Sequence, residues 1–117
     1  SLLVTGNRQL LEIALDNIVR NAFKFSDDQT VTCTLQVQAN SVTITVRDQG
    51  IGISQEDLNH IFQPFYRGEN ARTYSGYGIG LSLADRIIAL HKGKIQVTSG
   101  LGKGSVFQIT LPVTQSV

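Results

Sequence analysis

Residues 42–53 read VTITVRDQGIGI, and this stretch decides the fold. Val42, Ile44 and Val46 alternate with polar residues, which is the period-two pattern of a strand with one buried face. Asp48 stands where that alternation would place a further apolar side chain, and a buried carboxylate needs hydrogen-bond donors from backbone, water or a ligand. The stretch therefore predicts a strand that ends in a polar site.

Two glycines follow the strand at alternate positions, Gly50 and Gly52. An aspartate at a strand end can also cap the next turn without binding anything. The glycines favour a binding role, because a backbone without side chains can come into contact with a flat ligand. Asp48 is then a candidate acceptor for the exocyclic amino group of adenine.

Periodic apolar residues predict further elements on both sides of this stretch. The expected helices are 8–25, 54–60 and 81–91, and the other expected strands are 31–37, 94–99 and 105–111. In the last helix the residues expected to face inward are Leu83, Ala84, Ile87, Ile88 and Leu90. Helices gathered on one face of a mostly antiparallel, mixed sheet indicate a two-layer α/β sandwich. Residues 65–80 lack any period, and we expect them to form a lid.

The composition fits one domain, residues 1–117, and excludes some partners. Ten Lys and Arg against nine Asp and Glu give no overall field for nucleic acid or an anionic membrane. No apolar run reaches the roughly 20 residues of a membrane span. The chain starts without Met, so we expect a piece of a longer protein, and its single cysteine favours a reducing compartment, the cytosol. Cys33 lies in an apolar alternation and is expected to be an inert core thiol.

Asn17, Asn21 and Lys24 lie on one stripe of the first helix, at i, i+4 and i+7. Asparagine is a poor helix former, so two of them on a largely apolar face require a reason. One reason is a buried amide network that joins the helix to the sheet. The other is an amide oxygen on magnesium with Lys24 near phosphate oxygens.

Gly76, Gly78 and Gly80 precede the last helix, whose first amide hydrogens could hold phosphates. A GxGxG pattern alone is a weak signal. The sequence has no GxxxxGK[ST] loop, no dinucleotide-binding strand, turn and helix, and no protein-kinase catalytic loop.

Five segments resemble, in order and spacing, the motifs of the catalytic ATP-binding domain of bacterial sensor histidine kinases. They are the asparagine box LDNIVRNAFKFS (15–26), the first glycine box DQGIGI (48–53), the phenylalanine box IFQPFYRG (61–68), the second glycine box SGYGIGLSLADRIIALHKGKI (75–95) and the glycine-threonine segment GLGKGSVFQITLP (100–112). Ser105 stands where threonine is commoner. The resemblance covers nearly the whole chain and implies the Bergerat ATP-binding fold.

The resemblance implies that Asn21 coordinates magnesium with Asn17 close by, and that Asp48 binds the adenine amino group. It implies catalytic roles for Asn21, Lys24 and Arg67. The further residues that it implies at the nucleotide are Phe25, Gly50, Gly52, Ile53, Phe65, Gly76, Tyr77, Gly78, Ile79, Gly80, Leu81 and Ser105. Arg67 and Arg72 would reach the γ-phosphate, although plain solvation is an equal alternative. Phe62 and Phe65 would anchor the lid and meet the phosphoacceptor helices, with core packing as their alternative.

The implied activity is transfer of the γ-phosphoryl of Mg-ATP to a histidine on a helical dimerisation domain outside this chain, with a response regulator downstream. The isolated domain is expected to be a monomer and the full-length protein a homodimer, with the parent in the plasma membrane as one possibility. Another ATPase of the same superfamily and a non-catalytic relay module remain alternatives.

Two departures from the family pattern bear on this reading. Arg20 replaces an acidic or small polar residue before Asn21, so the domain is expected to lack a general base. His60 and His91 are outside any phosphoacceptor motif and are expected to be structural.

Overall fold

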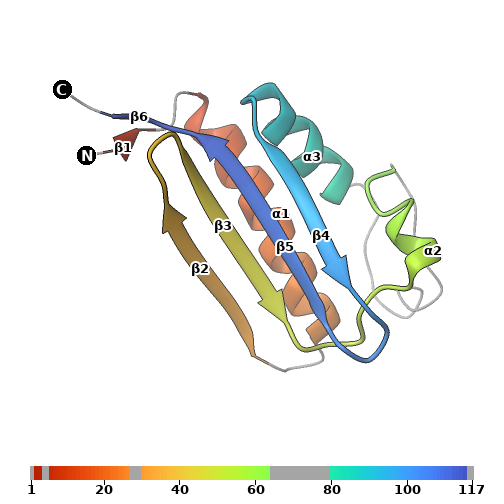
Figure 1. Ribbon diagram of the computed structural model, residues 1–117. Helices are drawn as coiled ribbons and strands as arrows, with labels where there is room; N and C mark the ends of the chain where they lie inside the picture. The colour runs from red at the N-terminus through yellow and green to blue at the C-terminus, as the bar shows by residue number, and fades with distance from the viewer. Residues whose placement is uncertain (1, 4–5, 27–29, 64–79, 116–117) are drawn as a thin grey trace.

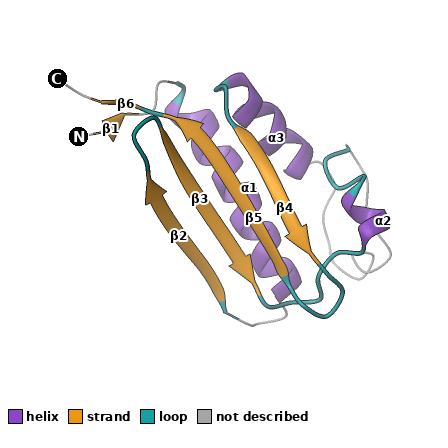
Figure 2. Ribbon diagram, viewed as in Figure 1, coloured by secondary structure: helices purple, strands orange, loops and turns teal. Residues whose placement is uncertain are grey.

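The computed structural model describes residues 2–3, 6–26, 30–63 and 80–115 (Figure 1). Nine elements follow one another along these residues, and Figure 2 separates the helices from the strands. They are β1 (Leu2–Leu3), α1 (Arg8–Ser26), β2 (Val31–Val37), β3 (Ser41–Asp48), α2 (Gln55–Leu58), α3 (Gly80–Leu90), β4 (Lys94–Ser99), β5 (Ser105–Pro112) and β6 (Thr114–Gln115).

Four strands form the main sheet in the order β2-β3-β5-β4, and the short β1 and β6 pair with each other beside it. Every strand pair within the described ranges is antiparallel, so the parallel pairing expected of a mixed sheet is not seen there. α1 and α3 lie side by side on one face of the sheet, and α2 is a single turn near the end of β4 (Figure 1). The two-layer α/β sandwich is confirmed.

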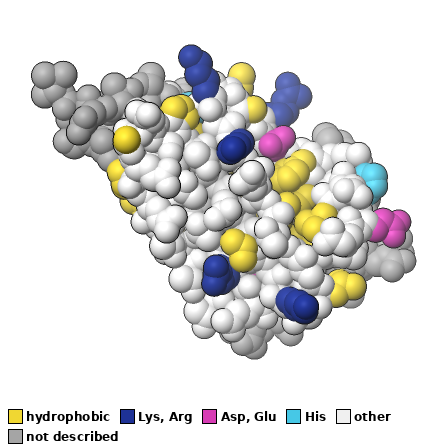
Figure 3. All heavy atoms as spheres, viewed as in Figure 1, with side chains coloured by type: hydrophobic (Ala, Val, Ile, Leu, Met, Phe, Trp, Pro, Cys, Tyr) yellow, Lys and Arg dark blue, Asp and Glu magenta, His cyan; other side chains and the backbone are white. Residues whose placement is uncertain are grey.

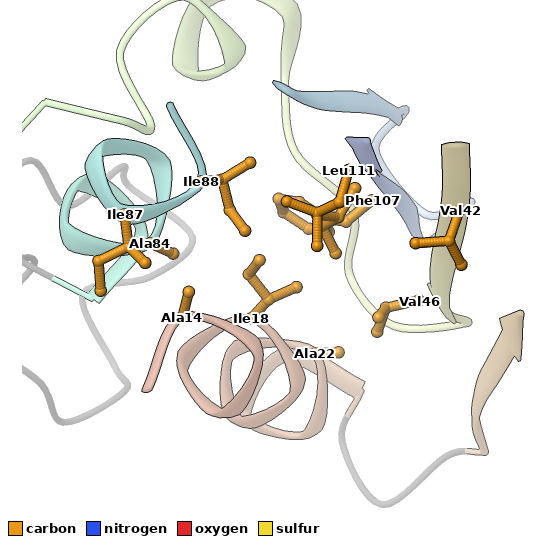
Figure 4. Close-up of a cluster of buried hydrophobic side chains, with 11 residues drawn as sticks. Ala14, Ile18, Ala22, Val42, Val46, Ala84, Ile87, Ile88, Phe107 and Leu111 are labelled. Atoms are coloured by element: carbon orange, nitrogen blue, oxygen red, sulfur yellow. The ribbon is translucent and has the colours of Figure 1, made fainter. Parts of the chain in front are cut away.

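The core lies between the two helices and the inward side chains of β3 and β5 (Figure 4). Ala14, Ile18 and Ala22 form the buried stripe of α1, where two alanines let the helix approach the sheet closely. Phe107 and Ile109 of β5 are fully buried opposite them. Truncating a residue such as Phe107 to alanine would cost about 3–5 kcal/mol.

The outer face of the sheet is polar. Figure 3 shows this side with scattered lysines and arginines, a few acidic side chains and some hydrophobic side chains among polar side chains and backbone. Thr34 pairs with Thr45 on this face, and Gln96 pairs with Gln108. The alternation of polar and apolar residues in each strand therefore gives one face to the helices and one to solvent.

Cys33 is exposed, so its expected place in the core is wrong. It pairs with Val46 on the helix-facing side of the sheet, but β2 is an edge strand. α1 packs mainly on β3, and α3 on β4, so β2 extends beyond the helical layer. Leu35 of the same strand is 62% exposed for the same reason.

Leu83 and Leu90 also face outward, with 42% and 75% of their surfaces exposed, against the expectation for this helix. The buried residues of α3 are Ser82, Ala84, Ile87 and Ile88. An amphipathic stripe buries only the residues that point at the sheet or at α1, and these two leucines lie on its flanks.

His91 joins the start of α1 to the end of α3, as its expected structural role requires. Its Nε2 accepts a hydrogen bond from the Asn7 backbone N–H at 2.9 Å, and its Nδ1 lies 2.7 Å from the Ile87 carbonyl oxygen. The Nδ1–H tautomer satisfies both contacts. Asn7 itself caps α1 by accepting from the Leu10 backbone N–H at 3.0 Å.

Within the described ranges, no helix combines the length and the hydropathy needed to cross a membrane.

Candidate nucleotide site

Three strands bring Asp48, Ser99 and Ser105 side by side at one end of the sheet. The register pairs Asp48 of β3 with Ser105 of β5, and Ser105 with Ser99 of β4. These residues continue the inward-facing alternation of their strands, so all three lie on the helix-covered side. The end of α1 and the turn after β3 lie at this same end of the sheet (Figure 1). A polar cluster thus closes one end of the apolar core.

Asp48 is 3% exposed and accepts a hydrogen bond at Oδ1 from the Gly50 backbone N–H at 2.9 Å. Burial raises the pKa of the Asp48 carboxyl above its ordinary value, while hydrogen bonds from the Gly50 and Ser105 backbones oppose the rise. A carboxylate has about four acceptor sites, so two backbone donors leave capacity for the donor of a ligand.

The loop after β3 packs backbone against backbone on the turn between β4 and β5. Gly52 has a φ of 75°, and a Cβ on it would overlap the carbonyl of Gly100. The Gly102 N–H donates to the Ile51 carbonyl at 2.8 Å. The structure therefore gives Gly52 a packing reason to be glycine, and its expected contact with a purine stays a prediction.

Ser99 connects three parts of this site and was not predicted from the sequence. Its Oγ accepts a hydrogen bond from the Ile53 backbone N–H at 2.7 Å and lies 2.8 Å from Ser105 Oγ. It also donates to the Gly104 carbonyl at 2.8 Å. The signal was present: Ile95, Val97 and Ser99 alternate inward as Val42 to Asp48 do, and again the last position is polar.

Asn17 and Asn21 are half-buried on the flank of α1 that leads to α3. A Cβ on Gly80, the first residue of α3, would lie 3.6 Å from Oδ1 of Asn17, so this amide reaches the start of that helix. Among the described residues neither asparagine side chain has a hydrogen-bond partner. This does not support the amide network between helix and sheet.

Arg20 pairs with an acidic residue of the same helix. Its Nε lies 2.7 Å from Oδ2 of Asp16, one turn earlier, and the two side chains are 78% and 57% exposed. The pair is a solvent-facing i,i+4 ion pair.

The remaining expected residues divide into two groups. Ile53, Leu81 and Phe62 are half-buried and pack against the core, which for Phe62 agrees with the core-packing alternative. Lys24 and Phe25 belong to the last turn of α1, but their side chains lie outside the described part of the chain. Also outside it are Phe65, Arg67, Arg72, Gly76, Tyr77, Gly78 and Ile79.

The short helix α2 begins as expected, since Ser54 Oγ accepts a hydrogen bond from the Asp57 backbone N–H at 3.1 Å. The helix ends at Leu58, and turns continue the chain through Gln63.

Comparison with known proteins agrees with this architecture. Residues 6–115 match the family described as histidine kinase-, DNA gyrase B-, and HSP90-like ATPase. The sensor histidine kinase RppB of Synechocystis is 39% identical over 111 residues, which are 92% of this chain and 24% of RppB. The sensor-like histidine kinase SenX3 of Mycobacterium tuberculosis is 38% identical over 115 residues, which are 96% of this chain and 28% of SenX3.

Two solved structures share the fold. The mycobacterial sensor histidine kinase MprB superposes with a TM-score of 0.87 at 28% identity, covering 97% of this chain and 78% of that one. Full-length ShkA in complex with AMPPNP gives a TM-score of 0.78 at 28% identity, covering 92% of this chain and 22% of that one. The chain spans about a quarter of the length of the curated relatives named above. It belongs to the histidine kinase-, DNA gyrase B- and HSP90-like ATPase family, and the relatives named above within that family are sensor histidine kinases.

Proposed function

We propose that the chain binds Mg-ATP with its adenine at Asp48, and that in the intact protein it transfers the γ-phosphoryl group to a histidine of a helical phosphoacceptor domain. The observation that carries this proposal is the buried Asp48 carboxylate, which has acceptor capacity left after its two backbone hydrogen bonds. A group that is costly to bury and incompletely used by the protein is a candidate for ligand recognition.

The adenine amino group would donate to Asp48, because an ionised carboxylate only accepts hydrogen bonds. Gly50, Gly52 and Ile53 would lie along the purine, since they form the loop that leaves Asp48. Ser105 would support the carboxylate from behind through its backbone N–H. This arrangement favours a base with an amino group over one that presents a carbonyl there.

The amide oxygens of Asn17 and Asn21 would face the phosphate end. Magnesium is held in proteins by one or two oxygen ligands together with substrate phosphates, so an amide oxygen of Asn21 fits its chemistry. The ion would supply charge neutralisation on the phosphate oxygens. Lys24 and Arg67 would add positive charge, and Gly76, Gly78 and Gly80 would offer backbone N–H groups. The residues proposed to surround the nucleotide from the remaining sides are Phe25, Phe65, Tyr77, Ile79 and Leu81.

The proposed reaction is a displacement at the γ-phosphorus. The imidazole nitrogen forms a bond to this phosphorus while the bond to the bridging oxygen breaks, and ADP leaves. A neutral imidazole already has a lone pair on its attacking nitrogen, so the transfer requires positioning and charge stabilisation more than a base. This agrees with Arg20, which is occupied by Asp16 on the solvent face.

The partners belong to the proposal as well, because the chain spans only a quarter of relatives such as RppB. They are the phosphoacceptor and dimerisation domain of the same protein, and a response regulator. The relative ShkA, solved with AMPPNP, supports a nucleotide in this fold. ATP as substrate favours the cytosol, and a membrane-bound parent is a further prediction.

The test combines binding with transfer. The chain is titrated with Mg-ATP in a calorimeter, then incubated with γ-labelled ATP and a separately supplied phosphoacceptor domain. We expect binding and label on the acceptor histidine, with neither for D48A. Binding without transfer, where a sibling kinase domain labels the same acceptor, would contradict the kinase role. Absence of binding at millimolar nucleotide would favour the relay module, and release of phosphate without acceptor label another ATPase of the superfamily.

A further inference from the structure

Ser99 lies where the loop after β3, the turn before β5 and the first residue of β5 meet. Its hydroxyl contacts the Ile53 N–H at 2.7 Å, the Gly104 carbonyl at 2.8 Å and the Ser105 hydroxyl at 2.8 Å. All three partners belong to segments that surround Asp48. A single side chain from β4 thus bridges these three backbone segments.

The direction of each hydrogen bond follows from donor and acceptor counting. A serine hydroxyl donates one hydrogen bond and accepts two, a backbone N–H only donates, and a carbonyl only accepts. Ser99 must therefore accept from Ile53 and donate to Gly104. Its remaining capacity is one acceptor site, so the contact with Ser105 requires Ser105 to be the donor.

This counting fixes the state of both serines. The Ser99 hydroxyl is saturated by protein partners, and the hydroxyl hydrogen of Ser105 points at Ser99. The Ser105 hydroxyl therefore offers only lone pairs to its other side, where Asp48 is the neighbour across the strands. The two hydroxyl groups therefore have no hydrogen left for a ligand and can only accept.

The contact with Ile53 also sets the shape of the loop. Gly52 and Gly100 meet backbone to backbone, and the Ile51 carbonyl accepts from Gly102, so the loop has little room to move toward the turn. The Ser99 hydroxyl fixes the far end of this loop by binding the Ile53 N–H.

We infer that Ser99 is a positioning residue for the nucleotide. It sets the separation of Ile53 from Ser105 and makes Ser105 a hydrogen-bond acceptor, without touching the nucleotide itself. The inference rests on the proposed function and deepens it. Because Ser99 acts on the adenine end, its loss should weaken binding and leave the transfer step at saturating ATP unchanged.

The test compares S99A with two matched variants. T98A removes a hydroxyl from the neighbouring residue, which is exposed on the other face and pairs with Val106. S99T keeps the hydroxyl. We expect the Kd for Mg-ATP to rise about three- to tenfold in S99A, as for one lost hydrogen bond, and to stay within about twofold of the parent in T98A and S99T.

Two further readouts separate positioning from general stability. Amide exchange of Ile53 should be faster in S99A than in T98A without nucleotide, and the transfer rate at saturating ATP should match that of the parent. The inference is overturned if S99A binds Mg-ATP as tightly as the parent chain, or no more weakly than T98A. The proposed function is tested separately by D48A.

A parent chain that does not bind Mg-ATP removes both proposals together. If S99A does not fold, the inference is tested with S99T alone. Its Kd for Mg-ATP is expected to lie within about twofold of that of the parent chain. A folded S99T that binds about tenfold more weakly contradicts the inference.

Discussion

Gly104 lies in backbone contact with Asp48. A Cβ built on Gly104 would overlap the Asp48 carbonyl oxygen, and the residue has a φ of 76°. The backbone of the turn between β4 and β5 is therefore packed directly against the end of β3. This strand end carries Asp48, the residue proposed to bind adenine. Glycine is required here for two separate reasons, its conformation and the absence of space.

The first prediction separates these two reasons. Gly102 has a φ of 75°, and a Cβ on it would meet nothing within 4 Å, so G102A adds conformational strain alone. We expect G102A to lower the free energy of unfolding by about 1 kcal/mol. G104A should lower it by about 1–3 kcal/mol more, because the backbone of β3 must shift. Urea unfolding of both variants measures the difference, and equal losses would show that space is not limiting at Gly104.

The second prediction concerns the division of the nucleotide site. D48A should abolish detectable ATP binding with or without magnesium, because the base loses its acceptor. N21A should weaken binding only when magnesium is present, since its amide oxygen is proposed to act through the ion. Calorimetry in magnesium and in EDTA checks both variants. The assignment would be contradicted if D48A bound ATP as tightly as the parent chain. It would also be contradicted if N21A bound ATP more weakly than the parent chain in EDTA.

The bounds of the helices and strands could be predicted well from the sequence because apolar residues recur in it at regular intervals. The expected helix 8–25 is observed as α1, Arg8–Ser26, and the expected strand 31–37 is β2. Asp48 was found because a charge at an inward position is rare. A period shows which face of a strand points inward, however, and not whether another layer covers it. Cys33 and Leu35 have the pattern of core residues, yet the helical layer covers β2 only in part.

Ser99 shows a second limit of prediction from sequence. Serine at the end of a strand is common, and only the pairing of β4 with β5 brings its hydroxyl to Ser105 and the Ile53 N–H. That pairing depends on the register of strands that the sequence does not state. Gly52 was predicted as part of the site for a different reason from the packing on Gly100 that the structure shows.

The third prediction follows from the exposure of Cys33. In the folded chain its thiol should react with a disulfide reagent such as Ellman's reagent to one equivalent, at a rate similar to that in urea. A core thiol would react only after unfolding. The C33S variant provides the blank, because Cys33 is the single cysteine of the chain. Reaction more than about 100-fold slower than in urea would show that β2 is covered.

The fourth prediction concerns pH. Burial raises the pKa of Asp48 above its ordinary value of 3.8, so the folded chain binds this proton more tightly than the unfolded chain. The contribution of Asp48 to the free energy of unfolding must therefore fall as pH rises from the ordinary pKa to the raised one. D48N removes this titration and keeps the shape of the side chain.

The difference in free energy of unfolding between D48N and the parent should thus move in favour of D48N from about pH 3.5 to neutrality. Urea unfolding of both chains across this range measures it, without nucleotide. D57N is the control, because it removes a carboxylate from α2, a helix with no buried residue. A parent that gains stability over D48N as pH rises would show that the Gly50 and Ser105 hydrogen bonds outweigh burial. The expected sign instead means that the site holds a charge at the expense of stability, as a ligand-binding carboxylate does.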